Sequence, residues 1–212
     1  DNFNGHDFAK HAIDRGAAAA LVNGSRVSRD FVGTKVEVAE TRHALGLLAS
    51  NYRNDFDIPL IAIGGSNGKT STKEILTTIL RQRFRTLCSE ASFNNEIGVP
   101  LTLLRLKEDH QFAIVEIGTN HPGELQSLLS IACPKYGILT SIGSEHLEFF
   151  GDLEGVLFEE GFLAESLPED GCLFVNGDIE GLAKLRKRCR ATIITVGESN
   201  RSDWIISGIE LS

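Results

Sequence analysis

The sequence lacks methionine altogether, and among its 212 residues it has only one tryptophan and two tyrosines. Because the first residue is Asp1 and no methionine occurs anywhere, we expect the chain to be a fragment of a longer protein. It also lacks any apolar run near the ~20 residues that a transmembrane helix needs. Residues 1–10 are polar and carry no apolar stretch of the kind that a secretory signal requires. The sequence therefore predicts neither membrane insertion nor secretion.

Cysteine is scarce and scattered. The four cysteines, Cys88, Cys133, Cys172 and Cys189, form no C-x-x-C pair. That spacing argues against a zinc site and against a disulfide framework. Scattered, reduced cysteines are typical of a cytoplasmic protein, which is the localisation that we expect.

Positive charge is also in deficit. The chain has 21 Lys and Arg residues against 29 Asp and Glu residues, which gives a net charge of −8. A general nucleic-acid binder needs a basic surface to neutralise phosphates, so we expect no nucleic-acid polymer among the partners. One basic cluster stands out, and we interpret it as a solvated helix face. It consists of Lys184, Arg186, Lys187, Arg188 and Arg190.

What the sequence does contain is an alternation of short apolar runs and amphipathic segments. The apolar runs predict strands at residues 17–22, 35–38, 60–63, 112–117, 136–142, 171–176 and 192–196. The amphipathic segments predict helices at residues 6–15, 41–52, 70–83, 123–132 and 180–189. In the helix at 70–83 we expect the apolar side chains to face the core, namely Ile75, Leu76, Ile79 and Leu80.

Strands that alternate with helices predict an α/β fold, in which a mostly parallel sheet carries helices on both faces. We place this P-loop-type sheet in residues 57–212 and part of a smaller α/β domain in residues 1–56. The proline at 59 opens the second section, after which the pattern of short strands and helices is regular.

A glycine-rich turn between the strand at 60–63 and the helix at 70–83 predicts a phosphate-binding loop. Its sequence from Gly64 is G-G-S-N-G-K-T-S. Glycines let successive backbone N–H groups point at phosphate oxygens, and the following helix adds the positive end of its dipole. We expect the loop to bind a nucleotide through Gly65, Ser66, Asn67, Gly68, Lys69, Thr70 and Ser71. The alternative is a tight turn without a ligand, and such a loop alone does not distinguish kinases, NTPases, motors and ligases.

The loop departs from the general P-loop pattern, because Ile63 stands where that pattern has its first glycine. It resembles instead the ATP loop of the Mur ligases, which commonly reads T-G-[ST]-N-G-K-[ST]-[ST] and also lacks that glycine. Downstream, N-N-E-I-G-V-P at 94–100, E-I-G-T-N-H-P-G-E at 116–124, G-S-E-H-L-E at 143–148 and N-G-D at 176–178 follow in the order of this family. Among its members, they are most similar to the type that adds D-alanyl-D-alanine to UDP-N-acetylmuramoyl-tripeptide.

The resemblance covers nearly the whole chain. Residues 4–8 and 16–18 look like the second half of the family's N-terminal substrate domain. The resemblance implies that the first half of that domain, the end of the central domain and the C-terminal domain lie outside this chain.

In such ligases, ATP phosphorylates a substrate carboxylate, and an amine then attacks the acyl phosphate. The resemblance implies Mg²⁺ and ATP, with UDP-muramoyl-tripeptide and D-alanyl-D-alanine as the small-molecule substrates. Lys69 would hold phosphates, while Thr70, Glu116 and His146 would bind Mg²⁺. From the residues alone, Glu116 could instead form an ion pair at a strand end, and His146 could be a hydrogen-bonded loop residue.

Several polar residues are further candidates for binding. The resemblance implies that Asn94, Asn95 and Glu96 hold the muramoyl-peptide and that His121 and Asn176 lie near the nucleotide. Turn chemistry is the alternative for the asparagines, because Asn side chains bond readily to nearby backbone groups. His121 could equally cap the turn before its helix.

One position departs from the family pattern. After the histidine motif, the family has a lysine in a segment like A-K-G-E, and that lysine is carbamylated and supports the Mg²⁺ site. The matching segment here is F-E-E-G-F at 158–162, which puts Glu160 at the lysine position. We expect Glu160 to supply the negative charge directly and count it among the catalytic residues. The alternative is a site that has lost catalysis.

The sequence is also compatible with other functions. One is a different ligase of the same superfamily, such as the diaminopimelate- or lysine-adding Mur enzyme or a folylpolyglutamate synthetase, against which N-N-E-I-G-V-P argues. Another is a nucleotide-binding module without catalysis. A third is an unrelated P-loop kinase or NTPase, in which His146 would have no role.

Overall fold

The computed structural model describes residues 4–144 and 147–208. The chain divides into two compact units, Asp1–Leu48 and Ala49–Ser212. The division falls inside helix α2 (Thr41–Asn54), earlier than the domain boundary at 56/57 that we expect from the sequence. The assignment of residues 1–56 to a substrate-binding domain stays a prediction.

The first unit is small. It contains a 3₁₀ turn η1 (Gly5–Phe8), helix α1 (Ala9–Asp14) and two parallel strands, β1 (Ala20–Val22) and β2 (Lys35–Glu37). Within its described residues, 4–48, the buried apolar side chains are Ala9 and Val22. His6 joins the turn to β1, because its Nε2 accepts a hydrogen bond from Asn23 N at 2.9 Å.

The second unit is built on a seven-stranded sheet with the order β4-β5-β3-β6-β7-β8-β9. Its strands are β3 (Leu60–Gly64), β4 (Thr86–Cys88), β5 (Phe112–Glu116), β6 (Tyr136–Leu139), β7 (Cys172–Asn176), β8 (Thr192–Gly197) and β9 (Trp204–Ile205). Every pair of neighbouring strands in the described sheet is parallel. The predicted α/β class and parallel sheet are therefore confirmed, although β4 and β9 are too short to stand out in the sequence.

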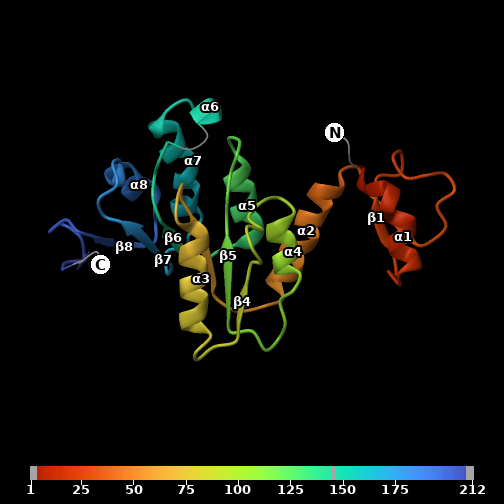
Figure 1. Cartoon of the computed structure of the whole chain (residues 1–212), viewed down its shortest axis with the longest axis horizontal. Helices are drawn as coiled ribbons and strands as arrows, with labels where there is room; N and C mark the ends of the chain where they lie inside the picture. The colour runs from red at the N-terminus through yellow and green to blue at the C-terminus, as the bar shows by residue number, and fades with distance from the viewer. Residues whose placement is uncertain (1–3, 145–146, 209–212) are drawn as a thin grey trace. The chain divides into compact units, whose positions relative to one another are not determined.

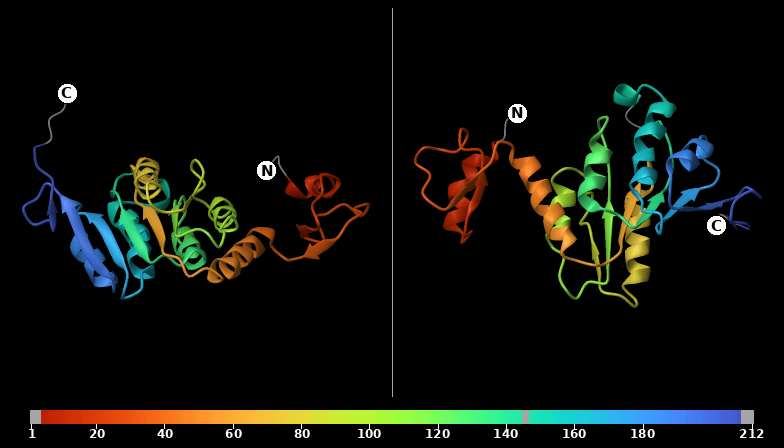
Figure 2. Two further views of the ribbon diagram at one scale, coloured as in Figure 1. Left: turned by 90° about the horizontal axis from the view of Figure 1, so that it is seen from below. Right: turned by 180° about the vertical axis from the view of Figure 1, so that it is seen from behind.

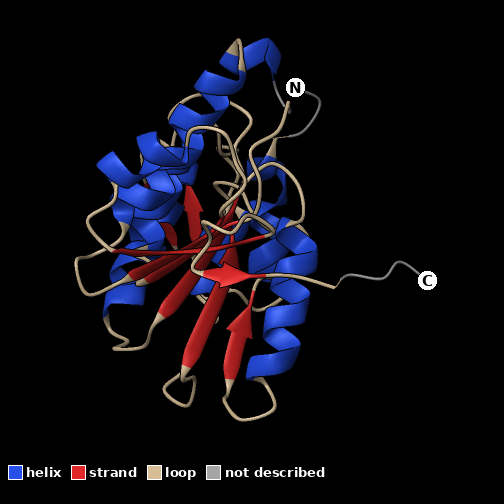
Figure 3. Cartoon of the chain, turned by 90° about the vertical axis from the view of Figure 1, so that its left-hand side faces the viewer, coloured by secondary structure: helices blue, strands red, loops and turns tan. Residues whose placement is uncertain are grey.

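Helices cover both faces of this sheet (Figures 1 and 3). Helix α3 (Lys69–Leu80) lies on one face, where Leu76 and Leu80 pack against Ile61, Ile63 and Ile114. The opposite face carries the larger core, and the view from behind in Figure 2 shows its helices. They are α4 (Gly98–Leu103), α5 (Glu124–Ala132), α7 (Leu153–Ser166) and α8 (Leu182–Arg188).

Helix α3 differs in detail from the sequence prediction. Leu76 and Leu80 face the sheet as expected, but Ile75 and Ile79 are 62% and 60% exposed. The inward positions belong instead to Lys73 and Thr77, which are buried. The apolar pattern was misleading because a lysine fills part of the buried face.

Helix α7 was not predicted, although it is among the longest helices of the second unit. Its N-cap is Asp152, whose Oδ1 accepts a hydrogen bond from Gly155 N at 2.9 Å. Because α5, α8 and the sheet all contact it, buried residues occur around most of its circumference and no one-sided apolar stripe appears. A short helix α6 (Leu147–Phe150) precedes it.

Arg188 departs from the expected solvated helix face. Its guanidinium lies 4.7 Å from the ring centroid of Phe158 and 5.2 Å from that of Phe162, and its Nη1 donates to Phe158 O at 2.6 Å. An ion pair with Glu165, at 2.6 Å, completes its contacts. Arg188 therefore fastens α8 to α7.

Replacing Arg188 by alanine is expected to lower the free energy of unfolding by about 2 kcal/mol, or about 4–8 °C in thermal midpoint. The change removes two cation–π contacts and a hydrogen bond to the α7 backbone. Thermal unfolding followed by circular dichroism measures it. Lys187→Ala, one residue away and exposed, is the matched control and should shift the midpoint by less than about 1 °C. Equal shifts for the two variants would contradict the fastening role.

The cysteines form no disulfide bonds among the described residues, and Cys172 and Cys189 are partly buried. The four cysteines, all within the described residues, are free. Burial raises the pKa of the Cys172 and Cys189 thiols, which lowers their thiolate fraction and their reactivity at neutral pH. In the described part of the chain, no helix has the length and apolar character required to span a bilayer.

Candidate functional site

The candidate site lies at the carboxyl ends of the central strands. From β3 the chain passes to β4 and β5 on one side of the sheet, and it later reaches β6 on the other side of β3. Such a switch in strand order opens a crevice outside the carboxyl ends of the strands, where ligands of open α/β sheets bind. The glycine-rich loop leaves β3 at this point.

The loop after β6 holds the glycine-rich loop in place. Ser141 O accepts a hydrogen bond from Ser66 N at 2.9 Å, and Ser141 Oγ accepts one from Asn67 N, also at 2.9 Å. Thr140 Oγ1 donates to Asn67 O at 2.6 Å. Gly65 has φ +107°, and a Cβ at this position would lie 2.5 Å from Thr140 Oγ1. Glycine is thus required there for both conformation and space.

The N-terminus of α3 presents backbone donors beside this loop. The first hydrogen bond of the helix runs from Thr72 N to Gly68 O. The N–H groups of Lys69, Thr70 and Ser71 precede it, and no described residue accepts a hydrogen bond from them. Such donors at the positive end of a helix dipole suit an anion such as phosphate.

Lys69 is folded back onto the loop. Its Nζ donates to Gly65 O at 2.6 Å and to Ser66 O at 2.8 Å. These carbonyls hold the ammonium group at the mouth of the loop, where it can exchange them for phosphate oxygens.

Glu116 is the last residue of β5 and is 1% exposed. Its Oε2 accepts a hydrogen bond from Thr70 Oγ1 at 2.8 Å, and its Oε1 accepts one from Asn94 Nδ2 at 2.9 Å. No lysine or arginine among the described residues forms an ion pair with it, so the alternative of an ion pair at the strand end finds no support. A hydroxyl and a carboxylate therefore meet beside the phosphate loop.

The asparagine motif lies opposite. Asn94 contacts Glu116 and covers Gly118, since a Cβ on that glycine would be 2.8 Å from Asn94 Nδ2. Asn95 Oδ1 accepts hydrogen bonds from Ile97 N and Gly98 N, at 3.1 and 2.9 Å, as a cap for α4. Both asparagines line the cavity described below, whereas Glu96 is exposed and does not belong to the lining set.

Gly98 fixes the position of this motif, because a Cβ there would lie 2.6 Å from both the Cα and the carbonyl carbon of Phe93. Gly98→Ala is therefore expected to displace the loop that carries Asn94, with a loss of about 2 kcal/mol in stability. The thermal midpoint and the side-chain amide resonances of Asn94 in a ¹⁵N correlation spectrum both measure this. Gly5→Ala, where a Cβ would meet nothing within 4 Å, is the control. Unmoved Asn94 resonances in Gly98→Ala would rule out the proposed close packing.

Helix α7 contributes two consecutive buried carboxylates, Glu159 and Glu160, which are 2% and 5% exposed. Glu159 faces the start of α5: it accepts hydrogen bonds from Gly123 N at 2.9 Å and from Leu125 N at 3.0 Å. Glu160 faces the phosphate loop, where its Oε2 accepts a hydrogen bond from Gly65 N at 2.8 Å. Each carboxylate thus holds a different loop.

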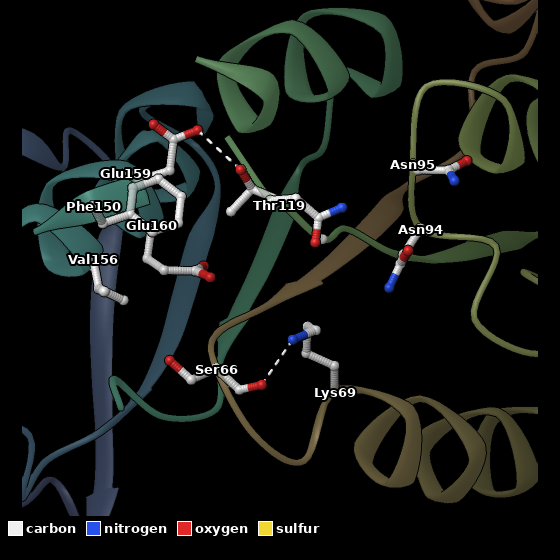
Figure 4. Close-up of a pocket in the computed structure, with 11 residues that line it drawn as sticks. Ser66, Lys69, Asn94, Asn95, Thr119, Phe150, Val156, Glu159 and Glu160 are labelled. Carbon is white, nitrogen blue, oxygen red and sulfur yellow. Dashed lines mark hydrogen bonds between the residues drawn. The ribbon is translucent and has the colours of Figure 1, made fainter. Parts of the chain in front are cut away.

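These parts enclose a cavity of about 90 Å³ (Figure 4). Figure 4 shows Glu159 and Glu160 on one side, Asn94 and Asn95 opposite, and Lys69 with Ser66 below them. The lining consists of Ser66, Lys69, Asn94, Asn95, Gly118, Thr119, Asn120, Phe150, Val156, Glu159 and Glu160. A volume of this size holds a few waters or an ion with some of its water, but not a whole nucleotide.

Two other candidates lie apart from this cavity. His121 is exposed, and its ring meets that of Phe149 edge-on at 4.3 Å between centroids. Asn176 Oδ1 accepts a hydrogen bond from Asp178 N at 2.9 Å, as in an Asx turn, and Asn176 lines a second cavity beside Ser141. Neither belongs to the described residues that line the first cavity. His146 lies outside the described residues.

Some residues that shape the site were not expected from the sequence. Thr140 and Ser141 hold the phosphate loop, and Glu159 holds the start of α5. Lys73 is fully buried, and its Nζ donates to Ser89 O at 3.0 Å and to Ala91 O at 2.6 Å. A lysine on the otherwise inward side of the amphipathic helix was the available signal.

The donor set fits a hard cation that takes few protein ligands. Within residues 4–144 and 147–208, no group of three or more His, Cys, Asp or Glu residues is placed to hold a metal ion. The Thr70 hydroxyl and the Glu116 carboxylate offer adjacent oxygen ligands. Mg²⁺ prefers oxygen and usually keeps several waters, so one hydroxyl and one carboxylate suit it.

The chain is similar to known proteins in both sequence and structure. Residues 63–212 match the family model for the Mur ligase middle domain. The UDP-N-acetylmuramoyl-tripeptide–D-alanyl-D-alanine ligase of Escherichia coli (strain K12) is 39% identical over 178 residues, which are 84% of this chain and 39% of that protein. The crystal structure of MurF from Acinetobacter baumannii superimposes with a TM-score of 0.86 at 32% identity, and the match covers 94% of this chain and 44% of that one.

A second solved structure is also similar to this chain. It is the MurF ligase from Thermotoga maritima in complex with ADP, with a TM-score of 0.83 and 27% identity over 97% of this chain and 47% of that one. The chain spans less than half of the length of each of these relatives. The family model, in contrast, covers the whole stretch from the end of β3 through the phosphate loop, Glu116 and α7. The chain therefore belongs to the Mur ligase family.

Proposed function

We propose that the protein containing this chain is an ATP- and Mg²⁺-dependent amide ligase of the cytoplasm. It would join D-alanyl-D-alanine to UDP-N-acetylmuramoyl-tripeptide in the synthesis of peptidoglycan precursors. The γ-phosphoryl group of ATP is transferred to the tripeptide carboxylate, which gives an acyl phosphate and ADP. The amine of the dipeptide then attacks the acyl carbon and expels phosphate, so that an amide bond forms.

The observation that carries this proposal is the contact between Thr70 and Glu116 at the mouth of the phosphate loop, 2.8 Å between oxygens. It brings the hydroxyl and the carboxylate of two separate family motifs together beside Lys69. The relatives support the choice of reaction, since the 39% identical protein is a D-alanyl-D-alanine ligase and the Thermotoga maritima structure contains ADP.

The residues of this chain would divide the work as follows. The N–H groups at the start of α3 and the Lys69 ammonium bind and orient the phosphates. Thr70 and Glu116 hold Mg²⁺, together with His146 as the family resemblance implies. When bound there, Mg²⁺ offsets the negative charge of the phosphates as the anionic carboxylate approaches.

Glu160 is the distinctive residue of this proposal. We infer that its carboxylate supplies the negative charge that a carbamylated lysine supplies in similar ligases. It lines the same cavity as Lys69 and Asn94, and it is 5% exposed. No reaction with CO₂ is then needed to complete the site.

Binding of the substrates is assigned to the remaining candidates. Asn94, Asn95 and Glu96 would contact the muramoyl-peptide, with Asn94 also fixing Glu116. His121 and Asn176 would lie near the nucleotide outside the phosphate cavity. The second cavity, which Asn176 and Ser141 share, adjoins the phosphate loop and has room for a larger group, with a volume of about 520 Å³.

The test is phosphate release by the complete protein with ATP, Mg²⁺ and UDP-muramoyl-tripeptide, recorded with and without D-alanyl-D-alanine. Release that requires both substrates is expected. Release that ignores the dipeptide would replace the proposal by an NTPase or by a ligase with another amine. Binding of Mg-ATP without any release would show a nucleotide-binding module without catalysis.

A further inference from the structure

Gly64 closes β3, and its backbone does not need glycine. Its φ lies outside the left-handed region, and it pairs with Leu139 of β6 in regular parallel register. What the position lacks is space. A Cβ there would lie 3.0 Å from Glu160 Oε2 and 3.3 Å from Leu163 Cδ2. Because Gly64 has no side chain, there is space beside it for a side chain from α7.

The carboxylate of Glu160 is the group that lies closest to this space beside Gly64. It comes from α7, which contacts β3, and its Oε2 lies against Gly64 while it accepts the hydrogen bond from Gly65 N at 2.8 Å. A buried carboxylate is strongly unfavourable without hydrogen bonds, and a charge-assisted bond to a backbone N–H offsets part of that cost. The bond to Gly65 thus offsets part of the cost of burying Glu160 and accounts for the direction in which its Oε2 points.

The bond also acts on the phosphate loop. Gly65 is the first residue after β3, and its φ of +107° turns the chain into the loop. With its N–H directed at Glu160, this residue is held from the α7 side, while Thr140 and Ser141 hold the loop from the β6 side. The loop is therefore fixed at its entrance and along its body by different elements.

We propose that Glu160 is a positioning residue for the phosphate loop and that Gly64 is its matched partner, which makes room for the carboxylate. Both positions depart from the Mur ligase pattern, which has threonine at the first and lysine at the second. The two departures fall on residues in direct contact, as expected if one required the other. The inference rests on the proposed nucleotide site but not on the ligase reaction.

A double-mutant cycle on the complete protein tests the pair, with Gly64→Ala, Glu160→Ala and the double variant. Gly64→Ala displaces the carboxylate and Glu160→Ala removes it, so each alone should weaken Mg-ATP binding by about tenfold. In the double variant the added methyl group meets no carboxylate. The double variant should therefore bind no worse than Glu160→Ala alone.

Glu159→Ala provides the matched control, because this neighbouring carboxylate is also buried but contacts α5 instead of Gly64. Combined with Gly64→Ala, it should give additive losses. Glu160→Gln keeps an acceptor oxygen for Gly65 N and provides a second variant if Glu160→Ala unfolds. It should preserve most of the affinity for Mg-ATP.

A second readout needs no nucleotide. The Gly65 amide proton in the nucleotide-free protein should move upfield in Glu160→Ala, move little in Glu160→Gln and stay unchanged in Glu159→Ala. The thermal midpoints of the cycle should show the same lack of additivity as the affinities. If Mg-ATP does not bind at all, the proposed function fails, but the Gly65 resonance and the midpoints still decide this inference.

The inference would be overturned by additive losses for Gly64→Ala and Glu160→Ala in either affinity or thermal midpoint. It would also be overturned by a Gly65 resonance that Glu160→Ala leaves in place. In either case, the lack of a side chain at Gly64 would be explained by the close packing of Leu163 alone and not by Glu160.

Discussion

Replacing Lys69 by methionine is expected to reduce phosphate release by more than about 100-fold. The ammonium group provides charge-assisted hydrogen bonds to phosphate oxygens, and losing two of them removes about 3 kcal/mol of stabilisation. The fold should be preserved. Lys69 is partly exposed, and among the described residues its ammonium donates to the carbonyls of Gly65 and Ser66 alone, so the thermal midpoint should change by less than about 4 °C. Steady-state phosphate release and thermal unfolding measure the two effects.

Lys73, in the same helix as Lys69, is expected to affect stability instead of phosphate binding. Its buried ammonium donates to the carbonyls of Ser89 and Ala91 and forms an ion pair with Glu74 at 3.0 Å, and Lys73→Met would leave both carbonyls without this donor. We expect a fall of at least about 5 °C in thermal midpoint for this variant. Lys107→Met, an exposed lysine before β5, should change neither quantity. Normal turnover in Lys69→Met would contradict the proposal that the glycine-rich loop binds the nucleotide.

The phosphate loop could be located from the sequence because its chemistry is local. The glycines, Lys69 and Thr70 are adjacent in the chain, and the flanking strand and helix have clear patterns. The groups that hold the loop could not be located in the same way. Thr140 and Ser141 lie more than 70 residues away, and ordinary threonine and serine residues carry no signal until the order of the strands places β6 beside β3.

Helix α7 shows a different limit. Sequence patterns find helices that are apolar on one side, whereas α7 is buried by α5, α8 and the sheet together. The family resemblance drew attention to Glu160 as a departure, but not to Glu159, which organises the start of α5. The available local signal was the N-cap Asp152, which marks where the helix begins.

The sequence leaves two roles open for the asparagine motif, contact with the substrate and turn chemistry. Both asparagines line the cavity beside Lys69, and their contact with a substrate stays a prediction. Asn95, however, uses its side-chain oxygen to cap α4, which is the turn chemistry that the sequence left open. Asn94 is committed to Glu116 through its amide nitrogen. Only the folded arrangement of β5 against this loop reveals that second contact.

The change Glu160→Gln separates the two roles proposed for this residue. Glutamine keeps an oxygen that can accept the hydrogen bond from Gly65 N, so the loop should stay in place and Mg-ATP affinity should fall by less than about threefold. The negative charge is lost, and turnover should therefore fall by about 100-fold or more, in line with the loss of a group that acts on charge in the transition state. Measuring the dissociation constant of Mg-ATP and kcat on the same preparations compares the loss of affinity with the loss of turnover.

Bicarbonate provides the decisive control, because a carbamylated lysine requires CO₂ whereas a glutamate does not. Activity of the unchanged protein should be the same in bicarbonate-depleted and bicarbonate-supplemented buffer. Glu160→Lys, combined with Gly64→Thr to restore the family pattern at both positions, should become dependent on bicarbonate if it is active. A strong bicarbonate requirement of the unchanged protein would show that the charge comes from another lysine. Full turnover in Glu160→Gln would leave Glu160 only its contact with Gly65, a positioning role without an electrostatic one.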